Sequence, residues 1–281
     1  MAIQPPGDYR APNGVFYRVV GDGAPLLLLH GLMASGPMFD PLVDPLRGQF
    51  RMIVPDLRGH GQSRDVAGPY DVPGLTGDLD AVLEHAGVDR CAVLGYSHGG
   101  AVAQQLAHTR PAVVSGMMLV CTYACNASTP RERVEASVLQ ILLTLFSTKT
   151  LVSLIIRPSE TKPGGEVGLS EAQAVWLRAQ MGGNRASQMR QAARALVTFD
   201  SRPWLGELQV PTLVAGGTHD VGVPQHHFDT LVNGIPGARS KLIERGGHTL
   251  LWTHTRELAD AVRAEWPAAQ DVGTIQQPQI S

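Results

Sequence analysis

The sequence predicts an α/β fold in which a doubly wound, mostly parallel β-sheet carries a helical cap as an insertion. Two patterns indicate this fold class. Short runs of consecutive apolar residues recur along the chain, and helix-like segments separate them. Apolar side chains at consecutive positions are typical of strands buried on both faces, as in a parallel sheet covered by helices. The alternation stops between residues 124 and 203, where the apolar residues repeat with helical spacing.

The predicted strands are short apolar segments bounded by turn-forming residues. Five of them are LLLLHG (26–31), RMIVPD (51–56), CAVLGY (91–96), MMLVCT (117–122) and TLVAGG (212–217). A further strand is expected around residues 240–243. Residues 15–20 end at the turn Gly21-Asp22-Gly23 and are predicted to form an antiparallel edge strand. Residues 72–85 and 101–108, which lie between the runs, are predicted helices.

The interruption of this alternation predicts how the chain is organised. We expect a core in two parts, residues 1–123 and 204–266, with a helical cap at 124–203 and a disordered tail at 267–281. In the cap, Ser128 or Thr129 can begin a helix that has Pro130 at its first position. Apolar residues then repeat at i, i+3, i+4 and i+7, and two further amphipathic stretches follow. The repeat consists of Val138, Ile141, Leu142 and Leu145, and Leu139, Leu143 and Phe146 widen this apolar face. The further stretches are 170–181 and 186–199.

Composition excludes several classes of partner. The formal net charge is −2, the sequence pI is about 6.5 and there is no run of basic residues, so no nucleic-acid partner is expected. The three cysteines are odd in number and the first residues lack a secretory apolar core, so a cytoplasmic location is expected. Polar residues at 147–150 interrupt the longest apolar stretch, so no transmembrane segment is predicted. Whether the chain forms a homodimer is left open.

One strand runs directly into a serine that is flanked by glycines, Gly95-Tyr96-Ser97-His98-Gly99. A sharp turn from a parallel strand into a helix strains the residue at the turn and needs small residues two places away. The glycines at 95 and 99 meet that need. Ser97 would then lie beside a helix N-terminus, where free amide hydrogens favour negative charge. The pattern therefore predicts a nucleophile with a site for an oxyanion.

A serine hydroxyl needs a base, and the base needs a carboxylate that orients it. Asp220 follows the predicted strand that ends near Gly216, and His248 lies in a glycine-rich loop after the predicted strand at 240–243. Nucleophile, acid and histidine in this chain order are expected of one fold. Asp229 is a less well placed acid. The alternatives of an ordinary turn serine at position 97 and a loop-capping Asp220 stay open at this stage.

From about residue 14 to 266 the chain resembles the α/β-hydrolase superfamily. The matching motifs are GYSHG (95–99), His30-Gly31-Leu32, DLRGHGQS (56–63), Asp220 to Pro224, and Gly247-His248. The resemblance implies Ser97 as nucleophile, His248 as general base and Asp220 as its partner. It implies an oxyanion hole made by the backbone amides of Leu32 and His98. His30 would hold the loop that presents Leu32.

The resemblance and the triad together predict a serine hydrolase of the carboxylesterase-like branch. Dehalogenases and epoxide hydrolases of this superfamily have an aspartate at the position of Ser97, so both are excluded. Acyl transfer through a serine ester leaves lactone, thioester and carbon-carbon bond hydrolysis open, as well as transfer to an alcohol or thiol. A non-catalytic ligand-binding protein with the same fold is the alternative from another class. No cofactor is expected, because the triad alone can carry out the reaction.

No metal site is expected either. His226 and His227 are adjacent, so their side chains are expected to point apart, and no Cys, Asp or Glu accompanies them at ligand spacing.

The substrate is predicted to be a small to medium, largely apolar carboxylic ester. The apolar faces of the cap are wide and mostly aliphatic, and such a face can line an acyl pocket. Leu142, Phe146 and Trp176 are the predicted substrate-binding residues. The alternative is that these side chains pack the cap internally or form a contact between two copies of the chain.

Overall fold

The computed structural model describes residues 4–158 and 166–267, so nearly all of the expected tail at 267–281 lies outside the described residues. An eight-stranded sheet forms the centre, in the order β1-β2-β4-β3-β5-β6-β7-β8. The strands are β1 (Gly7–Arg10), β2 (Phe16–Val20), β3 (Ala24–Leu29), β4 (Phe50–Pro55), β5 (Cys91–Tyr96), β6 (Val114–Val120), β7 (Thr212–Gly217) and β8 (Arg239–Ile243). Strands β3 to β8 are parallel, which confirms the predicted doubly wound, mostly parallel sheet.

The two N-terminal strands are antiparallel, and the prediction for the edge of the sheet was wrong. Strand β2 pairs with β4, but it is not the edge strand, because β1 pairs with its other side. The sequence of β1 is Gly-Asp-Tyr-Arg, and most of these residues are exposed. An exposed edge strand needs no apolar run, so the apolar patterns used to find the other strands do not detect it.

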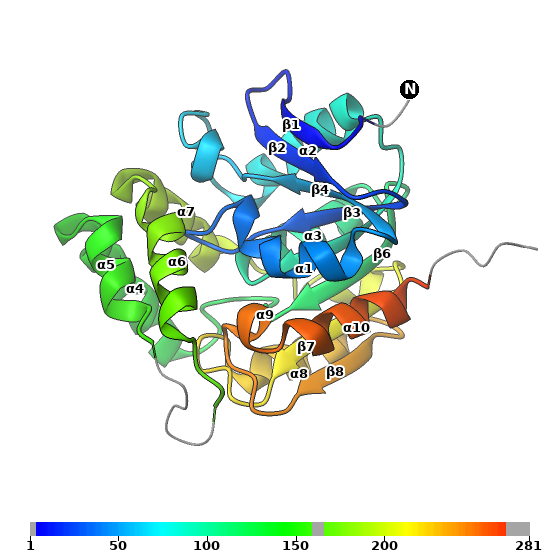
Figure 1. The fold of residues 1–281 in the computed structure, drawn as a ribbon. Helices are drawn as coiled ribbons and strands as arrows, with labels where there is room; N and C mark the ends of the chain where they lie inside the picture. The colour runs from blue at the N-terminus through cyan, green and yellow to red at the C-terminus, as the bar shows by residue number, and fades with distance from the viewer. Residues whose placement is uncertain (1–3, 159–165, 268–281) are drawn as a thin grey trace, which may run out of the picture.

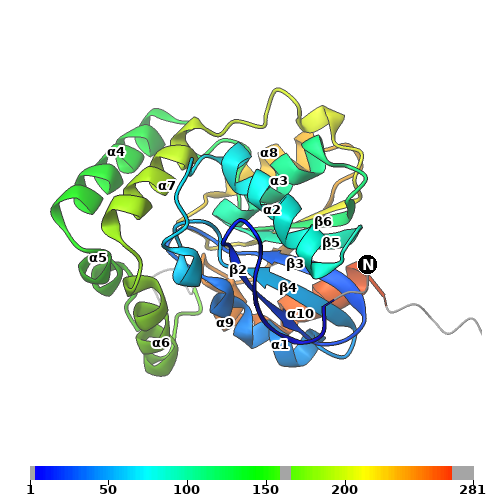
Figure 2. The ribbon, with the colours of Figure 1, turned by 90° about the horizontal axis from the view of Figure 1, so that it is seen from above.

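Helices cover both faces of the sheet (Figures 1 and 2). One face carries α2 (Val72–Ala86), α3 (His98–Thr109) and α8 (Gln225–Gly234), and the other carries α1 (Asp40–Leu46), α9 (Leu250–Thr253) and α10 (Thr255–Glu265). Short 3-10 helices occur at η1 (Gly36–Phe39), η2 (Gly61–Ser63) and η4 (Leu205–Glu207). Strand β3 shows why its apolar run is continuous: Leu27 and Leu29 pack with the first set of helices, and Leu26 and Leu28 pack with the second.

Among the described residues, four α-helices are inserted between β6 and β7 and lie beyond one end of the sheet (Figure 1). They are α4 (Pro130–Leu145), α5 (Thr148–Ile155), α6 (Glu171–Gly182) and α7 (Ala186–Thr198). Helix α4 packs on α7, and α5 packs on α6. Thr129 caps α4 and exchanges hydrogen bonds with Glu132, which forms a capping box. Of the two capping residues that the sequence left open, Thr129 is therefore the N-cap.

The four-residue repeat predicted for α4 does not mark its inward face, although two residues predicted to widen that face, Leu139 and Leu143, do point inward. Val138 is 46% exposed, Ile141 57% and Leu145 69%. The inward face instead follows Glu132, Ala136, Leu139 and Leu143, at i, i+4, i+7 and i+11. Apolar residues lie on both faces of α4, so the repeat could not show which face packs inward.

No helix within residues 4–158 and 166–267 combines the length and the apolar character needed to cross a membrane.

Candidate active site

Ser97 occupies a strained turn between β5 and α3. Its backbone has φ 52° and ψ −118°, a conformation that residues other than glycine rarely adopt. Its amide is held by the Val120 carbonyl of β6 at 2.9 Å. A Cβ on Gly99 would lie 2.0 Å from the Leu29 carbonyl oxygen, and one on Gly95 would lie 2.5 Å from the Gly99 carbonyl oxygen. Both glycines are therefore required for the strand and the helix to approach so closely.

The structure brings Ser97, His248 and Asp220 together in one chain of hydrogen bonds. His248 Nε2 lies 3.2 Å from Ser97 Oγ, and His248 Nδ1 lies 3.0 Å from Asp220 Oδ2. These separations allow Nδ1–H to donate to the carboxylate while Nε2 accepts from the serine hydroxyl. The three residues come from the ends of β5, β7 and β8, which meet at one edge of the parallel sheet. The arrangement matches the geometry needed to activate a serine.

Two backbone amides fix the Asp220 side chain. The amides of Gly222 and Val223 donate to Oδ1 at 2.9 and 2.8 Å, which leaves Oδ2 for His248. The carboxyl is 4% exposed. Burial alone would raise the pKa of Asp220, but the neighbouring His248 and the donated hydrogen bonds outweigh it, so the pKa lies below its ordinary value. Asp220 is thus held ionised, as an orienting carboxylate must be.

His248 is positioned by contacts other than Asp220. The Tyr96 hydroxyl donates a hydrogen bond to the His248 carbonyl, and the two rings lie 5.8 Å apart. Gly222 packs against the imidazole, since a Cβ there would lie 2.9 Å from His248 Cγ. The imidazole therefore sits in a fixed place between the acid and the serine.

The two amides expected to bind an oxyanion lie on either side of Ser97. His98 is the first residue of α3, where backbone N–H groups have no partner within the helix. On the other side, a Cβ on Gly31 would lie 3.2 Å from Ser97 Cβ, so this backbone passes close to the serine. Leu32 follows directly and lines the same cavity as Ser97.

Two buried histidines, His30 and His98, lie next to the backbone that surrounds Ser97. His30 Nδ1 donates to the Gly31 carbonyl at 2.8 Å and Nε2 accepts from the Leu57 amide at 2.8 Å, so the ring braces the loop before Leu32. The His98 imidazole is buried 3.3 Å from the Tyr123 hydroxyl. Burial, with the nearby His60, lowers the pKa of His98 to about 3. The ring is therefore neutral at physiological pH.

A cavity of about 300 Å³ opens beside Ser97 and His248. The inserted helices supply Glu132, Glu135, Ala136, Leu139 and Leu196, the segment before α4 supplies Asn126, and the core adds Leu32, Tyr123, Gly222, Val223, Pro224 and His227. Apolar and polar groups are thus mixed in its wall. Sequence reasoning missed the α4 residues as lining residues. Apolar residues lie on both faces of α4, so no pattern in the sequence indicated which of them line the cavity.

None of the three residues predicted to bind substrate lines this cavity. Leu142 packs among the inserted helices beside Leu143. Phe146 follows the end of α4 and is 43% exposed. The Trp176 ring lies 6.5 Å from the ring of Trp252, between centroids. Leu139 and Leu196 are the apolar residues that the inserted helices contribute to the wall.

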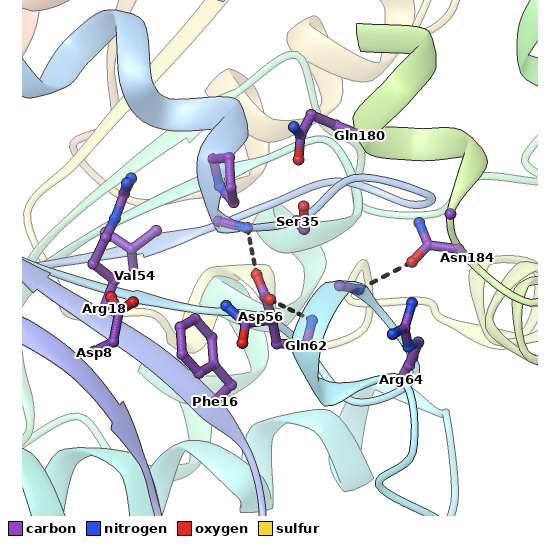
Figure 3. A pocket seen from close by; sticks show the side chains of 14 residues that line it. Asp8, Phe16, Arg18, Ser35, Val54, Asp56, Gln62, Arg64, Gln180 and Asn184 are labelled. Atoms are coloured by element: carbon purple, nitrogen blue, oxygen red, sulfur yellow. Dashed lines mark hydrogen bonds between the residues drawn. The ribbon is translucent and has the colours of Figure 1, made fainter. Parts of the chain in front are cut away.

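A second hollow of about 310 Å³ lies apart from the triad, between the core and the α6–α7 turn (Figure 3). Asp56 accepts hydrogen bonds there from the amides of Gly36 and Gln62, at 2.6 and 2.7 Å. The Asn184 side chain accepts from the Gly61 amide at 3.0 Å and donates to the Met33 carbonyl at 2.5 Å. These bonds tie the α6–α7 turn to loops of the core, and none of Ser97, Asp220 and His248 lines the hollow.

Two groups of side chains within the described residues have metal-ligating atoms close together: Cys121 with Asp220 and His248, and Glu132 with His226 and His227. In the first group, Asp220 and His248 belong to the hydrogen-bonded chain already described, and the buried Cys121 lies next to them. In the second, the adjacent histidine rings are 4.0 Å apart, which differs from the expectation that they point apart.

Comparison with known proteins agrees with this fold. The chain is 28% identical over 246 residues to the poly(3-hydroxyalkanoate) depolymerase of Ectopseudomonas oleovorans, covering 85% of this chain and 82% of the relative. A bromoperoxidase structure from Bacillus anthracis superposes with a TM-score of 0.85 at 20% identity, covering 92% of this chain and 99% of the other. An esterase structure from Exiguobacterium antarcticum gives 0.81 at 21% identity, covering 92% and 98%.

The model of the family described as "alpha/beta hydrolase fold" matches residues 24–255, which contain the strained serine turn, the acid and the histidine. The chain belongs to the α/β-hydrolase family.

Proposed function

We propose that this hydrolase is a serine carboxylesterase that works through Ser97, His248 and Asp220. The observation that carries the proposal is the continuous chain from Ser97 Oγ through the imidazole to Asp220, at 3.2 and 3.0 Å. It ends at a serine that lies beside a helix N-terminus and faces a cavity. An acyl-transfer site needs these three things together: an activated nucleophile, amide donors and space for a substrate.

The reaction follows from the positions of the groups. Ser97 Oγ attacks the ester carbonyl while His248 Nε2 takes the hydroxyl proton, and Asp220 stabilises the imidazolium that results. The amides of Leu32 and His98 donate to the oxyanion of the tetrahedral intermediate. His248 then gives the proton to the departing alkoxide, which leaves as an alcohol. Water repeats the sequence on the acyl-enzyme, releases the acid and restores Ser97.

We assign residues 1–123 and 204–266 to the catalytic core and residues 124–203 to a cap over the serine. Helices α4 and α7 support this division because they contribute five residues to the wall of the cavity that contains Ser97. A cap that closes the site excludes bulk water and strengthens the hydrogen bonds within it. The reducing compartment expected from the sequence is consistent with three buried free cysteines.

The residues that line the cavity beside Ser97 favour a neutral, small to medium, largely apolar ester as the substrate. Leu139 and Leu196 provide apolar contact for an acyl or alcohol chain, and a volume of about 300 Å³ suits a small substrate. Glu132 disfavours an anionic one. Burial raises its pKa, but Ser128, Thr129 and the two histidines lower it further, to about 2, so the group is charged. The name of the Ectopseudomonas relative also refers to the depolymerisation of a hydroxyalkanoate polymer.

Labelling with a fluorophosphonate probe tests the nucleophile. Wild type should gain one adduct by intact mass, and peptide mapping should place it on Ser97. Ser97→Ala should gain none, while Ser115→Ala, which changes an exposed serine on β6, should label like wild type. A folded wild-type protein that gains no adduct would favour the non-catalytic ligand-binding alternative. Product analysis with esters, lactones, thioesters and competing alcohols then separates the reactions that share this triad.

A further inference from the structure

A second cluster of reactive side chains joins the insert to the core. Glu132 comes from the first turn of α4, and His226 and His227 come from the first turn of α8. Glu132 Oε1 lies 2.9 Å from His226 Nε2 and 3.1 Å from His227 Nε2. All three ligand atoms lie within 4.8 Å of one another. Two imidazole nitrogens and one carboxylate oxygen therefore converge from two parts of the chain that are far apart in sequence.

The two histidine side chains converge although the residues are adjacent on α8. Adjacent residues on a helix leave it about 100° apart, but both imidazoles reach toward a partner that lies between them. The rings are tilted by 37° with their centroids 4.0 Å apart. The His227 side chain is 4% exposed and that of His226 is 44% exposed, so one of the two histidines is buried and the other is accessible.

The other oxygen of Glu132 is held in place. Ser128 Oγ and the Thr129 amide donate to Oε2 at 2.8 and 2.9 Å, so Oε1 remains directed at the histidines. Outer hydrogen bonds of this kind orient carboxylate ligands in metal sites. A neutral imidazole and an ionised carboxylate are the forms that bind a metal ion.

We propose that Glu132, His226 and His227 bind a zinc ion. Two imidazoles with one carboxylate suit zinc, whereas magnesium and calcium prefer sets made only of oxygen ligands. Ligand atoms on tetrahedral zinc are about 3.4 Å apart, and the two nitrogen–oxygen separations are 2.9 and 3.1 Å. Small side-chain movements would therefore admit the ion. Each imidazole would carry its proton on Nδ1 and ligate through Nε2.

A zinc ion at this position would affect both the packing of the insert and the cavity. It would join α4 to α8, and so fix the insert against the core. It would also lie at the wall of the cavity next to Ser97, because Glu132 and His227 line that cavity. An effect of zinc on ester turnover rests on the proposed function, but zinc binding itself does not.

Zinc titration of protein that has been dialysed against EDTA tests the site. A chromogenic chelator competes for zinc, and we expect one ion per chain for wild type. His226→Ala and Glu132→Gln should each weaken binding by at least roughly tenfold. His108→Ala is the matched control, because it removes another His–Glu pair, with Glu207 at 3.8 Å, and should bind like wild type. Zinc should also raise the Tm of wild type, and should do so much less for His226→Ala.

Two results would overturn the proposal. One is the absence of zinc binding by wild type at micromolar metal. The other is unchanged binding by His226→Ala together with loss in Cys121→Ala, since the ion would then lie at the cluster of Cys121, Asp220 and His248. His226 is partly exposed, so its alanine variant should remain folded, and thermal unfolding without zinc checks this. No step of the titration uses a substrate, so failure of Ser97 labelling and failure of zinc binding are separate results.

Discussion

The turn at Ser97 and helix α4 face the same cavity, yet different physical constraints place them. Ser97 is held by backbone contacts that leave no room for a side chain at either flanking glycine. Helix α4 has apolar residues on both faces, and only its contacts with α7 and with the core decide which side turns inward. Residues at the turn are therefore hard to substitute, whereas the outer face of α4 should tolerate changes.

Ser97→Ala should have the largest effect. Loss of the nucleophile should reduce kcat by roughly 10⁴-fold or more, because the remaining amides and binding contacts cannot replace covalent catalysis. Steady-state hydrolysis of p-nitrophenyl butyrate measures it, and circular dichroism checks the fold. A variant that retains a tenth of the wild-type rate would show that the reaction uses another residue.

Asp220→Asn should have the next largest effect on turnover. An asparagine can accept the same backbone hydrogen bonds but favours the wrong tautomer of His248, so kcat should fall by roughly 10²- to 10⁴-fold. The free energy of unfolding should change little by comparison. Asp229→Asn, at the acid judged less well placed, is the control. If Asp229→Asn lost activity and Asp220→Asn did not, the acid would be misassigned.

The free energy of unfolding should depend on pH, because three histidines are buried in the core in their neutral form. Burial is the main cause that lowers the pKa of His30 to about 4, and of His60 and His98 to about 3. An unfolded histidine has a pKa of about 6.5, so the unfolded chain binds more protons below that pH. The free energy of unfolding should therefore fall as the pH is lowered from about 6.5 toward 4. The carboxylate of Glu132, with its pKa lowered to about 2, keeps its stabilising contacts until the pH falls below about 4.5.

Urea unfolding at pH 7.5, 6 and 5 measures this dependence. An equal free energy of unfolding at all three values would mean that the histidines are not buried in neutral form.

The two faces of α4 should differ in stability. Leu143 is 1% exposed and packs with Val152 and Met189, so Leu143→Ala should lower the free energy of unfolding by about 2–5 kcal/mol. Leu145 is 69% exposed, and Leu145→Ala should change it by less than about 0.5 kcal/mol. Urea denaturation of both variants compares them directly. Equal effects would place the inward face elsewhere.

The smallest effect concerns selectivity. Leu139 lines the cavity and Val138 does not, so Leu139→Trp should shorten the acyl chain that the enzyme accepts. We expect the ratio of kcat/KM for p-nitrophenyl octanoate over acetate to fall by roughly tenfold. Val138→Trp should keep the wild-type ratio. If the two variants behaved alike, the acyl chain would not lie against α4.

Much of the site could be predicted from the sequence because local rules govern it. A strained turn requires glycines next to the serine, and the ends of parallel strands meet at one edge of the sheet, so Ser97, Asp220 and His248 were predicted to meet. Strand β1 escaped prediction because its exposed residues carry no apolar pattern. Leu142, Phe146 and Trp176 do not line the cavity beside Ser97, and helical periodicity, which gives the spacing of a face and not its direction, could not show this.

The sequence by itself determined the α/β class, the parallel strands and the place of the serine turn, since each depends on burial or backbone geometry within a few residues. Only the tertiary structure decided which face of α4 meets the cavity and that Glu132 meets His226 and His227. Those contacts join segments that are far apart in the sequence: Glu132 and His227 are separated by 95 positions. Their geometry depends on how whole helices pack, and no local pattern records it.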